Sequence, residues 1–317
     1  MKKVITAVLV TSSIASLSLA FALGADEATS FKSAVRESKL LSLAAREKAI
    51  DLGYEAFKKK VYKESFPGGV YIVNGDTPVA DEKELMDFYQ REIVAEWKST
   101  KFGIALGQGA TTQLILDAPN GNPAAWDNVS KRNLTYCISK TFGSNYTKTL
   151  QAIQSATQAW EAVADVRFVH VDSLDGQCDA STPGVVFDVR PVNVGGEYLA
   201  RAFFPRYARP QRNVLIDDSS FTLKPGKLEL AGILRHELGH TLGYRHEQTR
   251  PEAGKCFEDK NWVPLTSYDA FSVMHYPQCN GLGDWSLTLT QKDKLGAACL
   301  YGPASGSSFK PDSCNSI

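Results

Sequence analysis

Three of the chain's five histidines lie close together, in the segment HELGHTLGYRHEQTRP that begins at His236. An α-helix turns about 100° per residue, so His236 and His240, four positions apart, share one face. His246 would point away from that pair if the same helix continued through it. Gly243 lies between them, and glycine tolerates the left-handed conformation that ends many helices. A helix that ends at Gly243 would let the chain turn back and bring His246 to the other two histidines.

This spacing is typical of a metal site. Two imidazoles at i and i+4 on a helix bind zinc, and the glutamate between them, here Glu237, lies beside the metal as a base. With His246 the site has three protein ligands, and catalytic zinc sites keep their fourth position for water. Zinc lowers the pKa of that water to about 7, and Glu237 is predicted to take its proton for attack on a carbonyl. The alternative is a solvated, charged helix that happens to carry histidines.

The chain begins with an apolar segment, and its cysteines lie only in the later part. Lys2 and Lys3 precede an apolar run from Val4 to Leu23, and Ala20-Phe21-Ala22 fits a cleavage site, which predicts a signal peptide over residues 1–22 and a secreted or periplasmic protein. A membrane anchor is the competing interpretation, and polar residues inside the run argue against it. All six cysteines follow residue 136, so up to three disulfides are expected there. The net charge is zero and there is no basic block, which argues against nucleic-acid binding.

The pattern of apolar residues predicts an α+β fold with a mixed sheet. In the front part we expect a helix over 31–63, a hairpin at the Asn-Gly pair of 70–79, and a helix over 82–98. Residues 103–128 are rich in glycine, threonine and proline and are interpreted as a linker. Beyond it we expect strands at 134–139, 166–171, 184–190, 198–205 and 213–217, and helices over 148–164, from about Leu228 and from about Thr290.

The segment HELGHTLGYRH matches the HExxHxxGxxH signature of the metzincins, which this chain therefore resembles. SVMHY, from Ser272 to Tyr276, is similar to the methionine turn that follows in that family. The resemblance implies a metzincin-type catalytic domain with a mixed twisted sheet, an active-site helix and a C-terminal helix. It implies that Met274 forms a hydrophobic floor under the zinc ligands. It also implies that Tyr276 stabilises the oxyanion, as in astacins and serralysins.

Two further features resemble different metzincin groups. Glu247 directly follows the third histidine, as in astacins, where that glutamate pairs with the mature N-terminus. LARAFFP, which begins at Leu199, resembles the matrixin strand at the edge of the cleft, where an extended peptide can bind by backbone hydrogen bonds. That edge strand comprises Leu199, Ala200, Arg201, Ala202 and Phe203. The mixture is similar to secreted bacterial metzincins, including the HEIGH-type metallopeptidases.

Further ion sites receive little support from the sequence. Matrixins carry a second zinc on additional histidines, but here only His170 and His275 remain, so one catalytic Zn²⁺ is expected. His275 should be turned away from the metal by the alternation of side chains. Ca²⁺ is weakly indicated at Asp217-Asp218, where a solvated turn is the alternative.

A front part without cysteine excludes the matrixin device of blocking zinc with a prodomain cysteine. VNGD, which ends at Asp76, partly resembles the astacin pattern F-x-G-D. Our hypothesis is that Asp76 occupies the fourth zinc position in a latent form; the alternative is a simple hairpin with Asp76 in solvent. We expect a mostly helical propeptide over 23–110, a linker and activation region over 111–133, and a catalytic domain over 134–317. The mature chain is expected to begin between 100 and 132, with Lys131-Arg132 as a candidate cleavage site.

The sequence as a whole predicts a monomeric, secreted zinc endopeptidase that is made as a zymogen and acts on proteins or peptides. A bridge between Cys256 and Cys279 is the favoured disulfide, because it would tie the segment after the ligands to the segment after the methionine turn. The alternatives are a catalytically inactive or toxin-like zinc-bearing binding module on the same fold, and a structural zinc domain with a fourth protein ligand. The presence of Glu237 favours the enzyme.

Overall fold

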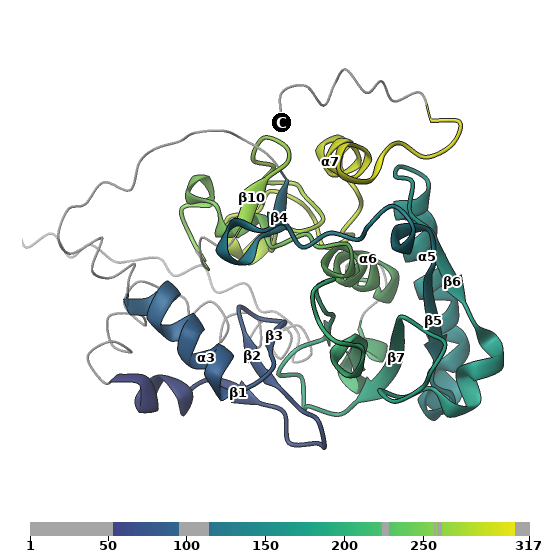
Figure 1. The fold of residues 1–317 in the computed structure, drawn as a ribbon, viewed down its shortest axis with the longest axis horizontal. Helices are drawn as coiled ribbons and strands as arrows, with labels where there is room; N and C mark the ends of the chain where they lie inside the picture. Colours follow the sequence, from purple (N-terminus) through teal and green to yellow (C-terminus); the bar gives the residue numbers. More distant parts are fainter. Residues whose placement is uncertain (1–52, 95–113, 224–227, 257, 259–261, 308–317) are drawn as a thin grey trace, which may run out of the picture.

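The structure is a computed structural model, and it describes residues 53–94, 114–223, 228–256, 258 and 262–307 (Figure 1). The expected signal peptide, and residues 31–52 of the first expected helix, lie outside the described residues.

A five-stranded sheet organises the larger part of the molecule, in the order β6-β5-β7-β9-β8. β5 (Leu134–Ile138), β6 (Phe168–His170), β7 (Phe187–Val192) and β9 (Asn213–Asp217) are parallel, and β8 (Ala200–Arg201) runs antiparallel at the edge. The five strands predicted from the sequence are all present, so the α+β fold with a mixed sheet is confirmed. The edge strand is shorter than expected, because only two of its residues pair with β9.

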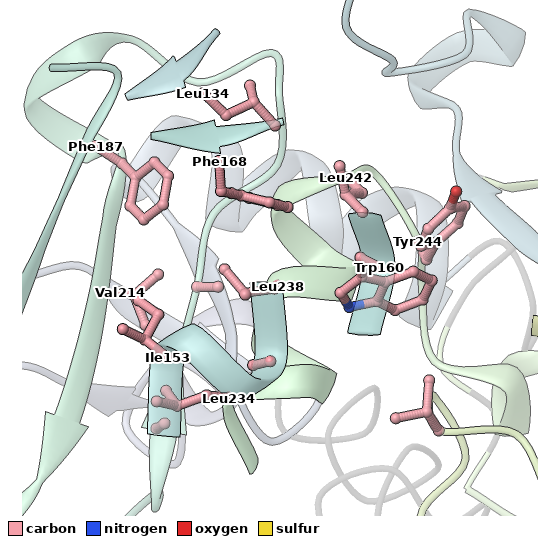
Figure 2. Packing of buried hydrophobic residues seen from close by; sticks show 14 of the residues in the cluster. Leu134, Ile153, Trp160, Phe168, Phe187, Val214, Leu234, Leu238, Leu242 and Tyr244 are labelled. Carbon is pink, nitrogen blue, oxygen red and sulfur yellow. The ribbon is translucent and has the colours of Figure 1, made fainter. Parts of the chain in front are cut away.

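Three longer helices accompany the sheet: α5 (Tyr146–Glu161), α6 (Leu230–Thr241) and α7 (Gln291–Tyr301). α5 packs on α6, and Figure 2 shows leucines of α6 among the aromatic and aliphatic residues of the main core. Trp160 is fully buried there, and its Nε1 donates to the carbonyl of Arg235 at 2.9 Å. Burying each such side chain contributes about 1.5–3 kcal/mol, so this contact fixes the helix that carries the histidines.

The segment interpreted as a linker belongs in part to the core. β4 (Ile115–Asp117) pairs antiparallel with β10 (Trp262–Pro264), and Leu114 and Leu116 are buried in the main hydrophobic cluster. The linker interpretation is therefore wrong from Leu114 onward. The glycine- and proline-rich composition around it hides a short apolar strand whose partner lies far along the chain.

The front part forms a unit with its own small core. β1 (Tyr62–Lys63), β2 (Tyr71–Val73) and β3 (Thr77–Val79) make an antiparallel sheet, next to α3 (Glu82–Phe88), which continues as a π-helical turn over Tyr89–Val94. The predicted hairpin is confirmed. The helix expected over 31–63 is helical only over 53–58 within the described residues, and its last two residues form a strand instead.

Short 3-10 helices make up most of the remaining regular structure. They are η2 (Pro119–Gly121), η3 (Ser130–Arg132), η4 (Lys140–Asn145), η5 (Asp172–Gln177), η6 (Arg209–Gln211), η7 (Asp218–Phe221), η8 (Glu247–Thr249), η9 (Pro251–Ala253) and η10 (Pro277–Cys279).

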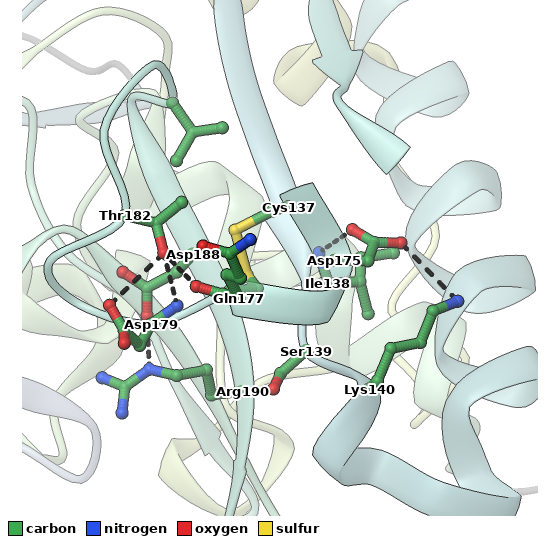
Figure 3. The surroundings of a disulfide bond; sticks show 12 residues. Cys137, Ile138, Ser139, Lys140, Asp175, Gln177, Asp179, Thr182, Asp188 and Arg190 are labelled. Atoms are coloured by element: carbon green, nitrogen blue, oxygen red, sulfur yellow. Dashed lines mark hydrogen bonds and ion pairs between the residues drawn. A yellow bond between two sulfur atoms is a disulfide. The ribbon is translucent and has the colours of Figure 1, made fainter. Parts of the chain in front are cut away.

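Between described residues, two disulfides fix the loops around the sheet and the site. Cys137 on β5 is bonded to Cys178, and Figure 3 shows the loop it ties down, where Asp175 accepts from the backbone N–H of Ile138 at 2.8 Å. The predicted Cys256–Cys279 bridge is confirmed. In the part of the chain that the structure describes, no helix has the length and apolar character needed to cross a membrane.

Candidate metal centre

Three imidazole nitrogens converge on one point. The Nε2 atom of His246 lies 3.2 Å from the Nε2 atoms of both His236 and His240. The carboxylate of Asp76 closes the group, at 3.4 Å from His236, 3.6 Å from His240 and 3.2 Å from His246. With ligand bonds of about 2.0–2.2 Å, the four ligands of a tetrahedral zinc ion stand about 3.3–3.6 Å apart. The donors and their spacing therefore fit a zinc ion.

Hydrogen bonds on the far side of each ring set the direction of these nitrogens. The Nδ1 atom of His236 lies 2.8 Å from the carbonyl of Val273, and that of His240 lies 2.7 Å from the carbonyl of Tyr244. The Nδ1 atom of His246 lies 2.6 Å from a carboxylate oxygen of Glu258. Because carbonyls and carboxylates only accept, each Nδ1 carries a proton, and each Nε2 is the nitrogen that would bind a metal at the centre.

Gly243 makes this convergence possible. α6 ends at Thr241, and Gly243 has φ +97°, in the left-handed region that favours glycine. A Cβ atom at this position would also overlap the carbonyl oxygen of Ala124. The chain then runs beside β4, where Arg245 donates its N–H to the carbonyl of Ile115 at 2.9 Å. Pairing with β4, which lies in the predicted linker, thus holds the chain after Gly243 so that His246 lies next to the helix.

Met274 packs against α6 at Gly239. It is fully buried, and a Cβ atom at Gly239 would overlap its sulfur, so glycine at this position lets the helix rest on the methionine turn. The carbonyl of Met274 also accepts the N–H of Glu247 at 2.9 Å. Gly239 is not among the residues predicted for the site, although its place between Glu237 and His240 is visible in the motif.

Tyr276 and Glu237 lie on the open side of the histidines. The Tyr276 hydroxyl donates to Asp76 at 2.6 Å, and its ring centre is 4.5 Å from that of His246. Glu237 lines a cavity of about 80 Å³ together with His236, Tyr276 and Leu199 of the edge segment. His275 faces away from the centre, as expected, with its Nε2 2.8 Å from the hydroxyl of Tyr268.

The electrostatics of the cluster favour a carboxylate facing positive charge. Burial, only partly offset by Asp76, lowers the pKa of His240 to about 4, so its ring is neutral near pH 7. Burial opposes the charged forms of Asp76 and His246 as well. Even so, His246 and His240 hold the pKa of Asp76 well below its usual range, and Asp76 and Glu258 hold that of His246 well above it. The raised pKa of His246 means that its ring carries a second proton in this cluster, and a metal cation at the centre would take the place of that second proton.

Two acidic residues next to the ligands differ in their predictability. Glu258 is buried and contacts His246, Gln248 and Arg245. It could not be predicted as a site residue, because it lies outside every motif. Glu247 was predicted as a site residue; it is buried, accepts the N–H of Asp269 at 3.0 Å and lies 2.9 Å from the Nε atom of Arg250. Burial raises the pKa of Glu247 to about 8 despite that arginine.

The predicted substrate edge and the weak calcium site are occupied by protein groups. Arg201 of β8 is buried against Glu64 of the front part, and Phe204, just beyond the edge segment, packs on His240. Asp217 does not lie in the solvated turn that was the alternative to a Ca²⁺ site: it is buried and accepts the N–H groups of Val194, at 2.6 Å, and Gly196, at 3.2 Å. Asp218 is exposed.

Comparisons with known proteins agree with this geometry. The matrixin family matches residues 125–253. Interstitial collagenase from Equus caballus is 31% identical over 242 residues, which are 72% of this chain and 44% of that protein. Interstitial collagenase from Bos taurus is 30% identical over 190 residues, which are 57% of this chain and 34% of that protein. This chain therefore spans less than half the length of these relatives.

The solved structures that are similar to this chain include the high choriolytic enzyme 1 of Oryzias latipes, a hatching enzyme zinc-protease. It has a TM-score of 0.37 and 18% identity, over 56% of this chain and 94% of that one. The family match and the collagenase relatives, together with the histidine cluster and the methionine turn, lead to one conclusion: over residues 125–253 this chain carries a matrixin-type domain of the metzincin metallopeptidases.

Proposed function

We propose that this chain is a zinc-dependent endopeptidase that is secreted as a zymogen and cleaves peptide bonds in proteins or peptides. The observation that carries the proposal is the set of three inward-facing Nε2 atoms with Glu237 and Tyr276 beside them. His236, His240 and His246 would hold the ion. Bound zinc supplies a water whose pKa is lowered to about 7 and a positive charge that polarises the substrate carbonyl.

The side chains around the ion have separate roles in this proposal. Glu237 takes the proton of the attacking water and passes it to the leaving amine. Tyr276 turns from Asp76 to donate a hydrogen bond to the oxygen that becomes negative. The edge segment around Ala200 holds an extended substrate by backbone hydrogen bonds, as unpaired strand edges do.

Asp76 accounts for latency in the same scheme. It lies at the tip of the β2–β3 hairpin, where Asn74 and Gly75 have φ of +52° and +96°, and its side chain is buried against all three histidines. A carboxylate in the position of the catalytic water excludes that water. It also engages the hydroxyl of Tyr276 that the oxyanion would need.

Asp76→Ala in the full chain tests this role. We expect the variant to process itself and to gain activity earlier than wild type during a time course of expression. Asp87→Ala is the matched control, because Asp87 is an exposed acid of the same unit. Unchanged latency of Asp76→Ala would remove the aspartate from the account.

Processing is proposed to occur before Leu114. Leu114 and Ile115 are buried, and the other candidate, Lys131-Arg132, is poorly accessible because Lys131 is buried with its Nζ 3.1 Å from Asp165. N-terminal sequencing of the secreted protein tests this assignment, and a mature chain that begins after Arg132 would contradict it.

Glu247 is the proposed partner of the new N-terminus. Its Oε2 atom is buried and accepts no hydrogen bond from the described residues. Glu247→Gln should therefore lower the Tm of the processed protein more than that of the precursor. Equal shifts in the two forms would show that the residue has only a structural role.

The activity itself is tested with the processed chain and casein. We expect hydrolysis that a chelator abolishes and that added Zn²⁺ restores. A protein that binds zinc but cleaves neither casein nor gelatin would favour the binding-module alternative.

A further inference from the structure

A second cluster of buried, hydrogen-bonded polar side chains lies at the edge strand, in the region of the histidine cluster. The carboxylate of Glu64 accepts hydrogen bonds from the Nε of Arg201 at 2.6 Å, from the Nη2 of Arg201 at 2.9 Å and from the hydroxyl of Tyr198 at 2.6 Å. The backbone N–H of Val70 adds a fourth hydrogen bond at 2.9 Å. Glu64, Arg201 and Tyr198 are all buried.

The two side-chain donors, Arg201 and Tyr198, belong to the larger part of the molecule. The Nη1 of Arg201 donates to Asn213 on the neighbouring strand β9 at 2.8 Å, and Asn213 in turn donates to the carbonyl of Pro210 at 3.2 Å. Of the three side chains only the acceptor, Glu64, belongs to the proposed propeptide, as does the Val70 backbone that donates to it. Among the described residues Arg201 has no other carboxylate partner. Removal of the front part would leave a fixed guanidinium and hydroxyl at the sheet edge without an anion.

The site is adjacent to the proposed substrate path. Arg201 follows Ala200 in β8, and Tyr198, Leu199 and Ala200 line the same cavity as Glu237. An arginine fixed for two parallel hydrogen bonds matches a carboxylate in geometry as well as in charge. Removal of the front part would uncover this cation, and a substrate that supplied a carboxylate to it would bind more strongly than one that did not.

We propose that Arg201 and Tyr198 form a carboxylate-binding subsite of the processed enzyme. Glu64 fills this subsite in the precursor, and a glutamate or aspartate side chain of the substrate fills it after processing. The proposal rests on the proposed function, since it requires both a removable front part and a peptide substrate. It names an acidic side chain as a specificity determinant of the cleavage.

The test uses a set of fluorogenic peptides that differ only in one residue. A single glutamate, or the isosteric glutamine, is moved one position at a time along an otherwise fixed apolar sequence. We expect one position at which the processed enzyme has a kcat/KM about tenfold to hundredfold higher for glutamate, as for a charge-assisted pair of hydrogen bonds. This ratio should fall as salt is added, because added ions compete for the exposed guanidinium.

Matched variants assign the preference to Arg201. Arg201→Gln is made together with Glu64→Gln, so that no carboxylate is left facing a missing cation in the precursor. Glu64→Gln alone is the control, because its processed enzyme is the same as wild type and must keep the full glutamate preference. In the double variant the ratio should fall to near one. Should that variant fail to fold, Tyr198→Phe removes one donor and should lower the ratio severalfold.

Each outcome has a clear meaning. Equal cleavage of glutamate and glutamine peptides at every position by the wild-type enzyme would overturn the subsite and leave the endopeptidase standing. A glutamate preference that survives in the double variant would assign it to other residues and likewise overturn the proposal. Absence of chelator-sensitive cleavage of every peptide and of casein would instead remove the proposed function, and the subsite with it.

Discussion

The bond between His246 and Glu258 gives the sharpest structural prediction. His246 is the one histidine ligand outside the helix, and its ring is held by the 2.6 Å contact between its Nδ1 and the Glu258 carboxylate. Glu258→Gln keeps the size of the side chain but removes the charge that makes the imidazole a stronger donor to metal. Loss of such a partner typically weakens metal binding 10- to 100-fold, or by about 1.4–2.8 kcal/mol.

The assay is a competition titration of Zn²⁺ between the full-length protein and a chromophoric chelator of known affinity. Glu252→Gln is the control, since Glu252 is an exposed glutamate of the same segment. Glu258 also pairs with Arg245, but in the variant Arg245 keeps Asp117 as a partner at 3.5 Å. A large loss of stability is therefore not expected. Zinc affinity within twofold of wild type would refute the reasoning that Glu258 positions and polarises His246.

Three further predictions follow from the same geometry. Gly243→Ala places a Cβ on a residue with φ +97° and against the carbonyl of Ala124, so it should destabilise the protein by about 2 kcal/mol or more and lower its zinc content. Gly176→Ala is the control, because Gly176 lies in open space, and it should change neither property. Normal stability and zinc content of the Gly243 variant would contradict this prediction. Tyr276→Phe should keep zinc but lower kcat of the processed enzyme about 10²- to 10³-fold with little change in KM, and an unchanged kcat would exclude its hydroxyl from the reaction. Burial lowers the pKa of His275 to about 4, so its contribution to stability is present above pH 6.5 and is lost as pH falls toward 4. When the free energy of unfolding is measured in urea at several pH values in this range, His275→Gln should reduce its slope against pH by up to about 1.4 kcal/mol per pH unit. Equal slopes for the variant and the wild type would contradict the assignment.

Local signals in the sequence predicted most of the fold. The strands of the five-stranded sheet follow apolar runs bounded by turn residues, and α7 begins after Thr290, whose side chain and that of Asp293 cap the helix reciprocally. The Asn-Gly pair predicted the hairpin that presents Asp76. The break at Gly243 followed from helical geometry alone, because the third histidine could not otherwise reach the first two.

Contacts between distant segments could not be predicted in this way. β4 is three residues long, and nothing local reveals that its partner is Trp262–Pro264. The carboxylates of Glu64 and Glu258 look like any other acidic side chains in the sequence, and only the tertiary structure pairs them with Arg201 and His246. For the same reason the sequence left open whether Asp76 faces solvent, whereas the structure buries it.

The central claim is that Glu237 acts on a water at a zinc ion held by three histidines. Its most direct test is Glu237→Gln, with the zinc content and the casein hydrolysis of the same processed protein measured together. We predict about one equivalent of zinc, as in wild type, and a rate reduced by about 10²- to 10⁴-fold, the usual contribution of a general base. Casein hydrolysis at the wild-type rate by the zinc-loaded variant would contradict the account.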